Sequence, residues 1–411
     1  MSQEEAVERI QDGRGARGPQ LTRRAALALA AVALAGCSTG GSGQDASEPD
    51  DNPAEAEVKE PTLDDRAAEV VAGLTLEQKV SQLFFVSPES VFAADPVVAA
   101  GETSREALSQ HPVGGICYFA KNLIDPDQTR QMLANVSQFS QEACGLPLFL
   151  SVDEEGGTVA RVASNEAFGV DNVGNMCDVG ATGDPQKAYD ACRTMAGYLA
   201  DLGFNLDFAP VCDIVNGTSA TMAKRSFGSS AEVVTPMVEA AVKGFLEGGV
   251  QCSAKHFPGI GNAEGDSETE PIVTHRTADQ LEAEEYRPFE AAIAAGVPFV
   301  MVGHIAVPEV TGDDTPASLS RTMVTDVLRG QLGYQGIVIT DSLGMGALSA
   351  YSTEDRVVRA LAAGADMLLM PADFQTAFDA VLAAVQAGTI SQDQVDESVT
   401  RIAKLKLALQ G

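Results

Sequence analysis

Acidic and basic side chains recur where β-prone apolar runs of this sequence end. Asp341 directly follows one such run, and Lys255 and His256 stand at the end of another. A loop rich in Gly and Pro then leads to Asp266 and Glu268. Cleavage of a glycosidic bond requires a carboxylate at the anomeric carbon and a carboxylic acid at the leaving oxygen. The two acidic loops could supply that pair of groups.

Eight short apolar runs must position these groups. Most are continuous apolar segments without alternation, which is typical of parallel strands that are buried on both faces. The runs are Leu83–Val86, Gly115–Phe119, Leu146–Val152, Asn205–Val211, Gln251–Phe257, Pro298–His304, Gly336–Thr340 and Asp366–Met370.

Amphipathic stretches rich in Ala, Leu, Glu and Gln separate the apolar runs and read as helices, and Thr75 and Ser391 are helix start signals. The alternation predicts an α/β fold, a (β/α)8 TIM barrel in one catalytic domain. A doubly wound open sheet is the alternative, because sequence alone does not show closure. The predicted helices include 126–142, 185–202, 231–247, 278–295, 353–363 and 392–409.

The barrel makes a further prediction, that polar groups for chemistry gather at the carboxyl ends of its strands. Asp153, Glu154 and Glu155 follow the third run, and Asp213 follows the fourth. His304 closes the sixth run. Some of these residues could instead cap the helices that follow, but we do not expect this of all of them.

Several motifs in order along the chain resemble those of family 3 glycoside hydrolases, and the most similar branch is that of the bacterial β-N-acetylhexosaminidases. The similarity extends from about Leu74 to the end. It implies a (β/α)8 barrel and a retaining mechanism with a covalent glycosyl intermediate, acting on terminal β-linked N-acetylglucosamine of peptidoglycan fragments or of chitin or other glycan oligomers. The motifs are Asp153-Glu154-Glu155-Gly156-Gly157 with Arg161, Asn205 to Val211, Lys224-Arg225-Ser226-Phe227, Lys255-His256-Phe257-Pro258-Gly259, Met301-Val302-Gly303-His304 and Thr340-Asp341.

The resemblance also implies roles for single residues. Asp341 matches the nucleophile, and Lys255 and Arg225 beside it would keep its pKa low. Arg225 could also fork two hydrogen bonds onto sugar hydroxyls or onto Asp153. Alternatively, Lys255 and His256 could form structural salt bridges at the rim of the barrel. The residues assigned to substrate binding are Asp153, Arg225, Lys255, His256 and Met345.

One position departs from the family. In the hexosaminidase branch the loop normally ends Asp-Ser-His, and the His, oriented by the Asp, is the acid/base. Here Glu268 occupies that position, and His275 lies too far along the chain to replace it. Glu268 could be the acid/base itself, another residue could act, or activity could be lost. We favour the first hypothesis, because like-charge repulsion from Asp266 would raise the pKa of Glu268 toward the protonated form that an acid requires.

Two alternative functions stay open. β-Glucosidases and β-xylosidases of the same family draw their acid from a second domain after the barrel, whereas this chain ends at Gly411 soon after the last predicted helix. We therefore expect the acid to come from the barrel's own loops. A catalytically inactive sugar-binding lipoprotein is the other alternative. An ionised Glu268 would repel phosphate, so we expect a hydrolase and not a phosphorylase. Acid/base chemistry with two carboxyl groups requires neither a metal nor an organic cofactor.

Charge and hydropathy restrict the partners of this chain. The 411 residues include 27 Lys and Arg against 58 Asp and Glu, a net charge of −31. This excess of negative charge argues against nucleic-acid binding and polybasic adhesion to membranes. No run reaches the roughly 18 to 20 apolar residues that a membrane span requires. We expect a monomer with a carbohydrate substrate.

The first 62 residues are predicted to be a signal peptide followed by a linker. Arg23 and Arg24 precede a short apolar run that ends in Leu-Ala-Gly-Cys, the layout of a signal peptide with a lipoprotein box. We expect residues 1–36 to be a signal peptide, 37–62 a lipid-attached acidic linker and 63–411 the catalytic domain. Lipid on Cys37 would then be the sole attachment to the membrane, on its extracytoplasmic side. A buried Ala-rich helix is the alternative.

Six further cysteines lie beyond the lipoprotein box. Their spacing contains no Cys-x-x-Cys pair, so a structural zinc site is not expected. In an oxidising compartment Cys177 and Cys192 could form a bridge. We expect Cys117, Cys212 and Cys252, which lie in the apolar runs, to be buried thiols.

Overall fold

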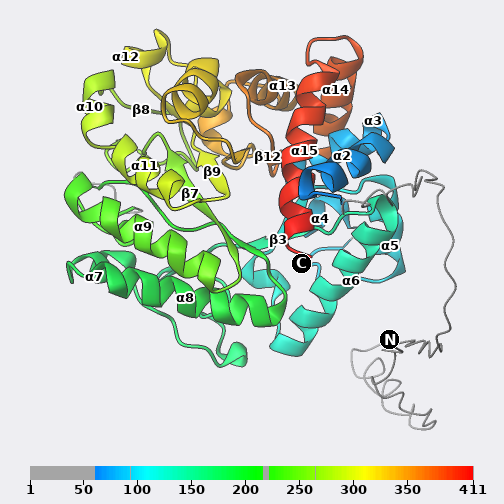
Figure 1. Cartoon of the computed structure of the whole chain (residues 1–411), viewed down its shortest axis with the longest axis horizontal. Coiled ribbons are helices and arrows are strands. Elements are labelled where there is room, and N and C mark those ends of the chain that lie inside the picture. Colours follow the sequence, from blue (N-terminus) through cyan, green and yellow to red (C-terminus); the bar gives the residue numbers. More distant parts are fainter. Residues whose placement is uncertain (1–60, 93, 216–221, 264, 411) are drawn as a thin grey trace, which may run out of the picture. The chain divides into compact units, whose positions relative to one another are not determined.

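The computed structural model describes residues 61–410 except residues 93, 216–221 and 264 (Figure 1). The predicted signal peptide, Cys37 and all but the last two residues of the predicted linker lie outside the described residues. The first helix of the described residues, α2 (Leu63–Gly73), begins with a capping box in which Thr62 and Asp65 each bond the other's backbone N–H. Within the described part of the chain, no helix is long and apolar enough to cross a membrane.

Eight parallel strands form the central sheet, and each lies within one of the eight predicted runs. Their spatial order is β12, β1, β2, β3, β6, β7, β9, β11. A parallel bridge between Ile339 of β11 and Met367, directly before β12, joins the two end strands. The predicted (β/α)8 barrel is thereby confirmed, and the alternative of a doubly wound open sheet is excluded. The strands are β1 (Phe84–Val86), β2 (Gly115–Cys117), β3 (Phe149–Val152), β6 (Leu206–Asp207), β7 (Gln251–Phe257), β9 (Phe299–Val302), β11 (Ile337–Thr340) and β12 (Leu368–Leu369).

The strands are apolar because they are buried on both faces. Large side chains fill the barrel interior, where the rings of Phe149 and Phe299 meet edge to face with centroids 5.1 Å apart. Phe85 and Phe208 form a second pair, with centroids also 5.1 Å apart. Such aromatic pairs contribute about 0.5–1.5 kcal/mol beyond the area that they bury. The core therefore provides a rigid base for the loops at the strand ends.

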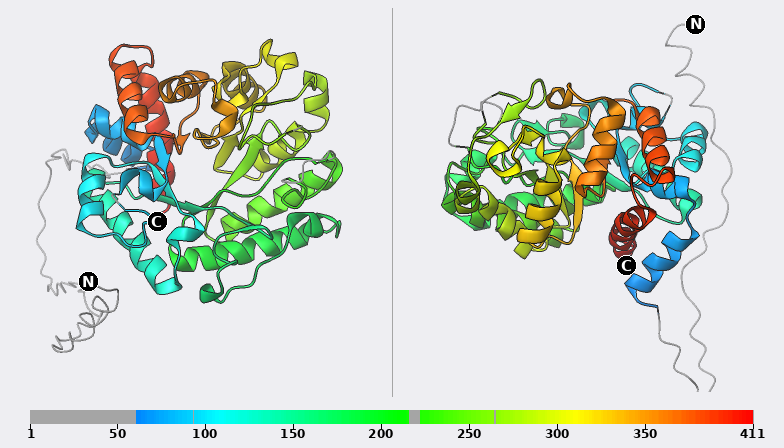
Figure 2. Two further views of the ribbon diagram at one scale, coloured as in Figure 1. Left: turned by 180° about the vertical axis from the view of Figure 1, so that it is seen from behind. Right: turned by 90° about the horizontal axis from the view of Figure 1, so that it is seen from above.

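Helices surround the sheet, and α15 packs beside α2, so that segments from the two ends of the domain meet (Figures 1 and 2). Thr75 and Ser391 are N-caps, as predicted. A π-helix (Thr322–Gln331) lies between β9 and β11. The other α-helices of the described residues are α3 (Leu76–Gln82), α4 (Pro88–Val91), α5 (Glu102–Gln110), α6 (Pro126–Cys144), α7 (Met176–Gly180), α8 (Pro185–Leu202), α9 (Ala231–Glu247), α10 (Ala278–Ala283), α11 (Tyr286–Ala294), α12 (Pro308–Thr311), α13 (Thr353–Ala363), α14 (Phe374–Gln386) and α15 (Gln392–Ala408).

One predicted helix is two. The stretch expected as 278–295 breaks at Glu284, whose φ of −127° and ψ of −78° are not helical. The break turns the next residue, Glu285, inward, where it is 3% exposed and accepts hydrogen bonds from Asn262 and Arg276. Burial of a paired carboxylate thus overrides the helical pattern of the sequence.

The suggested Cys177–Cys192 bridge is wrong. Both residues are free thiols. Cys192 lies on the buried face of α8, and burial raises its pKa well above the ordinary value, which favours the inert thiol form. Cys177 is only partly buried, on α7. Cys117, Cys212 and Cys252 are buried free thiols, as expected.

Two small sheets that were not predicted lie in the connections after the barrel strands. Strand β4 (Glu154–Gly156) directly follows β3 and pairs antiparallel with β5 (Val159–Ala160). Strand β8 (Ile272–Val273) pairs in parallel with β10 (Ile305–Ala306). Both hold loops that carry candidate site residues.

Candidate active site

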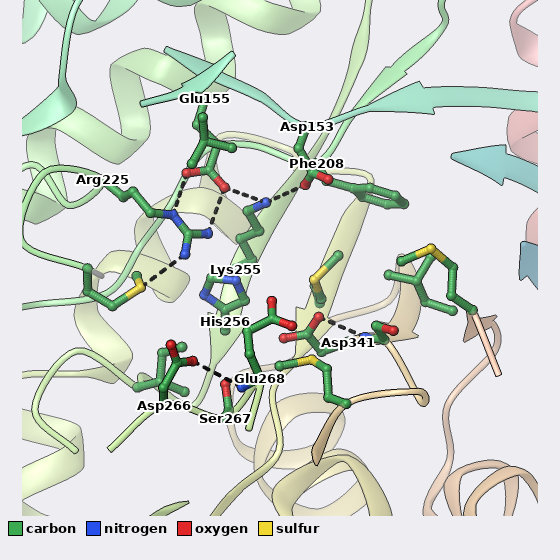
Figure 3. A pocket seen from close by; sticks show the side chains of 18 of the residues that line it. Asp153, Glu155, Phe208, Arg225, Lys255, His256, Asp266, Ser267, Glu268 and Asp341 are labelled. Atoms are coloured by element: carbon green, nitrogen blue, oxygen red, sulfur yellow. Dashed lines mark hydrogen bonds and ion pairs between the residues drawn. The ribbon is translucent and has the colours of Figure 1, made fainter. Parts of the chain in front are cut away.

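A cavity of about 580 Å³ opens at the carboxyl ends of the barrel strands (Figure 3). It brings together every residue that the sequence assigned to catalysis or substrate binding. These are Asp153, Arg225, Lys255, His256, Asp266, Glu268, Asp341 and Met345.

A network of alternating charges forms one wall of the cavity. The Nζ atom of Lys255 lies 2.8 Å from Oδ1 of Asp153 and 2.7 Å from Oε1 of Glu155. Arg225 donates from Nε and Nη2 to the two oxygens of Glu155, at 2.7 Å each. The predicted pair of hydrogen bonds from Arg225 to Asp153 is therefore wrong. Asp153 forms an ion pair with Lys255, and the guanidinium group of Arg225 pairs with Glu155.

Glu155 is a site residue that the sequence assignment missed. It is 2% exposed and lines the same cavity. Burial alone would raise its pKa, but the positive charges of Lys255 and Arg225 outweigh burial and lower that pKa to about 2. The available signal was the period of two in extended backbone, which places Asp153 and Glu155 on the same side.

Glu154 points to the other side and does not line the cavity. Its carboxylate accepts the backbone N–H groups of Arg161, Val162 and Ala163 at 2.6, 2.8 and 2.9 Å. The hydroxyl of Tyr198 on α8 donates to it at 2.8 Å. The middle member of the acidic run therefore holds the hairpin that carries its two neighbours.

His256 is oriented by Asp213. Its Nδ1 lies 2.8 Å from Oδ2 of Asp213, which also accepts the backbone N–H of His256 at 3.2 Å. The other oxygen of Asp213 accepts the N–H of Ile260 at 2.7 Å. Asp213 is fully buried, so this carboxylate fixes the imidazole from behind while His256 lines the cavity.

Asp341 follows β11 directly, and its Oδ1 accepts the backbone N–H of Ser342 at 2.7 Å. Burial acts to raise the pKa of Asp341, but His256, this N–H group and Lys255 together lower it below the ordinary value. The carboxylate is therefore ionised, the form that attacks an electrophilic carbon.

His304 supports the backbone that follows Asp341. Its Nε2 lies 2.9 Å from the carbonyl oxygen of Ser342 and its Nδ1 lies 2.7 Å from Oγ of Ser318. Burial lowers the pKa of His304, which favours a neutral ring. Nε2 then donates to the carbonyl and Nδ1 accepts from the serine.

The side chains of Glu268 and Asp341 point toward each other in the cavity (Figure 3). Its pKa is raised, first by partial burial and then by the negative charges of Asp341 and Asp266. The expected direction is thus confirmed, although Asp266 is not the largest cause. Asp266 also accepts the backbone N–H of Glu268 at 3.0 Å. His275 lies outside the cavity lining, and its side chain is 76% exposed.

Within the described residues, no three or more His, Cys, Asp or Glu side chains are grouped so that they could hold a metal ion. The cavity's cations are Lys255, Arg225, Arg161 and Lys224. Nε of Arg161 is buried and has no hydrogen-bond partner in the part of the chain that is described.

A (β/α)8 barrel that carries one ionised and one protonation-prone carboxyl group at its strand ends defines a protein of the barrel glycosidase class. Comparison with known proteins agrees with this class. The profile described as "Glycosyl hydrolase family 3 N terminal domain" matches residues 75–405. The chain belongs to glycosyl hydrolase family 3.

Similar proteins named beta-hexosaminidase or β-N-acetylglucosaminidase support this family assignment. Beta-hexosaminidase A of Pseudoalteromonas piscicida is 33% identical over 331 residues, which cover 74% of this chain and 55% of that protein. Beta-hexosaminidase LpqI of Mycobacterium tuberculosis is 32% identical over 402 residues, 93% of this chain and 96% of that protein. A solved family 3 β-N-acetylglucosaminidase from Paenibacillus has a TM-score of 0.76 at 38% identity, covering 82% of this chain and 64% of that one. The chain thus spans just over half of the first relative and nearly all of the second.

Proposed function

We propose that this protein is a retaining, exo-acting β-N-acetylhexosaminidase that releases terminal β-linked N-acetylglucosamine. The observation that carries the proposal is the pair of facing carboxyl groups whose pKa values are pushed apart, downward for Asp341 and upward for Glu268. Such a separation assigns a nucleophile and an acid. The names of the relatives support the choice of sugar.

The reaction then proceeds in two steps. In the first, a carboxylate oxygen of Asp341 bonds to the anomeric carbon while the bond to the leaving oxygen breaks, and Glu268 gives its proton to that oxygen. In the second, ionised Glu268 takes a proton from water, the water oxygen bonds to the anomeric carbon, and the bond to Asp341 breaks. Two inversions retain the configuration of the sugar.

The charged wall holds the sugar during both steps. Lys255 and Arg225 keep Glu155 ionised, and Lys255 also pairs with Asp153, so the wall presents acceptors and donors in fixed positions. Hydroxyls of the sugar ring can bond to both kinds of group without rearrangement of the site. This preorganisation lowers the cost of aligning the anomeric carbon with Asp341.

The first experiment measures nitrophenol release from the β-N-acetylglucosaminide and from the β-glucoside. We expect turnover of the former alone, and NMR of the first-formed product should show retained β configuration. Preference for the glucoside would assign the protein to the β-glucosidases. Binding of N-acetylglucosamine without turnover of either substrate would instead make it a silent sugar-binding protein.

Two cations of the cavity lie outside the ion-paired wall and can contact a leaving group that carries negative charge. Arg161 and Lys224 line the cavity in addition to the paired Lys255 and Arg225. We therefore propose peptidoglycan fragments, whose muramic acid bears a carboxylate, over uncharged chitin oligomers. Turnover of muropeptides should exceed that of chitobiose and should fall with added salt. Equal rates on the two substrates, independent of salt, would contradict this choice.

Water, and not phosphate, is proposed as the acceptor. In the second step Glu268 is ionised and would repel an anionic acceptor in a partly desolvated cavity. Turnover in phosphate buffer, followed by phosphorus NMR, should yield no glycosyl phosphate. Formation of that product would make the protein a phosphorylase.

We also propose that the protein is exported and anchored by lipid on Cys37. Labelled palmitate should enter the wild-type protein but not Cys37→Ala, which should appear in the soluble fraction. Membrane association of the variant equal to that of the wild type would contradict the proposed anchor.

A further inference from the structure

Two backbone hydrogen bonds join the loop that carries Glu268 to the turn that follows Asp341. The N–H of Gly346 donates to the carbonyl oxygen of Glu268 at 2.9 Å, and the N–H of Ala347 donates to that of Ser267 at 3.1 Å. We call residues 265–270 the acid/base loop and residues 342–348 the nucleophile turn. The two catalytic segments are thus directly connected through their backbones.

This connection is possible because residue 346 has no side chain. A β-carbon at Gly346 would lie 2.4 Å from the carbonyl oxygen of Thr269 and 2.5 Å from its carbonyl carbon. Both are backbone atoms, so no rotation of a side chain could relieve the contact. A larger residue at this position would push the acid/base loop away from the nucleophile turn.

The nucleophile turn is itself fixed to the barrel. The N–H of Leu343 donates to the carbonyl of Leu369 in β12 at 2.8 Å, and Nη1 of Arg356 donates to the carbonyl of Leu343 at 2.6 Å. His304 bonds the carbonyl of Ser342. The turn therefore serves as a rigid reference for Asp341 and for whatever rests on it.

The acid/base loop, by contrast, has internal bonds that fix its shape but not its place. The N–H groups of Thr269 and Glu270 both donate to the carbonyl of Asp266 at 3.0 Å. The N–H of Glu268 donates to the Asp266 side chain. These bonds make the loop a compact unit, which the two bonds from the nucleophile turn attach beside Asp341.

We propose that Gly346 is a positioning residue, which sets the placement of the acid/base Glu268 relative to the nucleophile by allowing contact between the two backbones. This inference rests on the proposed role of Glu268. It predicts that a side chain at residue 346 impairs the proton transfers of Glu268 while the attack by Asp341 persists.

The test compares Gly346→Ala with Gly197→Ala. The control lies on α8, outside both catalytic segments, and a β-carbon there would meet nothing within 4 Å beyond its own helix. With an activated dinitrophenyl substrate, whose departure needs no acid, Gly346→Ala should accumulate the glycosyl enzyme. A misplacement of about 1 Å can cost about 10²-fold, so we expect kcat to fall 10- to 100-fold. Gly197→Ala should stay near the wild type.

Azide distinguishes a displaced acid/base from a displaced nucleophile. It attacks the glycosyl enzyme without a base, forming a carbon–nitrogen bond as the bond to Asp341 breaks. We expect azide to restore turnover of Gly346→Ala and to give the β-glycosyl azide. Wild-type kinetics of Gly346→Ala, or a loss that azide does not restore, would overturn the inference.

Two further measurements separate this inference from the proposed function. In a Glu268→Gln background, Gly346→Ala should cause no additional loss, because both changes remove the same proton transfers. If Glu268→Gln is impaired and Gly346→Ala is not, only the positioning role fails. If Glu268→Gln has wild-type rates, the proposed acid/base assignment fails as well.

Hydrogen exchange tests the contact in the wild type and does not depend on whether Gly346→Ala folds. The amides of Gly346 and Ala347 should exchange much more slowly than unstructured amides, because each donates a backbone hydrogen bond to the acid/base loop. Exchange of both at the rate of an unprotected loop would show that the two segments are not joined in solution, and the inference would fall.

Discussion

Glu155 and Arg225 form a forked ion pair in which Nε and Nη2 of the guanidinium each lie 2.7 Å from a carboxylate oxygen. Lys255 adds a third contact to the same carboxylate at 2.7 Å. The pair joins β4 to the loop before α9, and Lys255 joins both to β7. One buried carboxylate therefore holds three parts of the site together.

Glu155→Gln should destabilise the fold. Removal of one partner from a buried ion pair leaves an uncompensated charge and typically costs about 3–5 kcal/mol. Urea unfolding at pH 7 measures the change. The matched control is Glu239→Gln, which removes the surface partner of Lys243 and should cost no more than about 0.5 kcal/mol. A loss no larger than that of the control would contradict the structural role of Glu155.

The same residue predicts how stability depends on pH. The pKa of Glu155 is about 2 in the folded protein against an ordinary value of 4.5, so between these values the unfolded chain binds more protons. Its contribution to stability is therefore present above pH 4.5 and is lost as the pH falls toward 2. Urea unfolding across this range should show a weaker pH dependence for Glu155→Gln than for the wild type. Identical dependences would contradict the lowered pKa.

Asp341→Asn should abolish turnover without unfolding the protein. Loss of the nucleophile removes the covalent path, and we expect a fall in kcat/KM of at least about 10³-fold. Nitrophenol release measures the rate, and circular dichroism shows whether the fold persists. Asp326→Asn, a change at an exposed aspartate on the π-helix, is the control and should keep wild-type activity. Comparable activity in the two variants would remove Asp341 from the mechanism.

Glu268→Gln should slow substrates with poor leaving groups more than aryl glycosides with good ones, because only the former need a proton at the leaving oxygen. General acid catalysis contributes about 10²–10⁴-fold, which bounds the expected loss on natural substrates. Azide should restore turnover of activated substrates. Glu270→Gln, in the same exposed loop, should behave like the wild type. Equal losses on good and poor leaving groups would exclude acid catalysis by Glu268.

The pH profile of kcat/KM should have an acidic limb from Asp341 and an alkaline limb from Glu268. Activity requires Glu268 protonated, so its raised pKa extends activity toward higher pH. Asp266→Asn removes a negative charge that raises this pKa, and the alkaline limb should move to lower pH. An unchanged limb in Asp266→Asn would mean that another group controls it.

Much of the barrel could be predicted from sequence because parallel strands buried on both faces leave long apolar runs. The helices 185–202, 231–247 and 353–363 were predicted with the bounds that the structure shows. The break at Glu284 was missed, because its cause is a carboxylate paired with residues of another segment. Local pattern carries no information about such partners.

Within the site, motifs located the residues but not their pairing. Asp153, Lys255 and Arg225 were expected to lie close together. Which of them form ion pairs depends on Glu155, whose inward position follows from an unpredicted hairpin. The contact of Gly346 with Thr269 involves backbone atoms and leaves no trace in residue types beyond a glycine. These relationships arise only when the chain is folded.

The carboxylate of Glu154 has a consequence for exchanging parts between relatives. It accepts hydrogen bonds from the three successive amides of residues 161–163 and from the hydroxyl of Tyr198. One side chain therefore connects both ends of the segment 153–163 to the outer helix α8. A chimaera that imports another enzyme's version of this segment must take residues 153–163 as one cassette and keep a hydroxyl donor at position 198. Exchange of only half of the cassette would leave either the Glu154 carboxylate without its amide donors or the amides of residues 161–163 without their acceptor. The disrupted contact would then lie away from the junction between the two sequences.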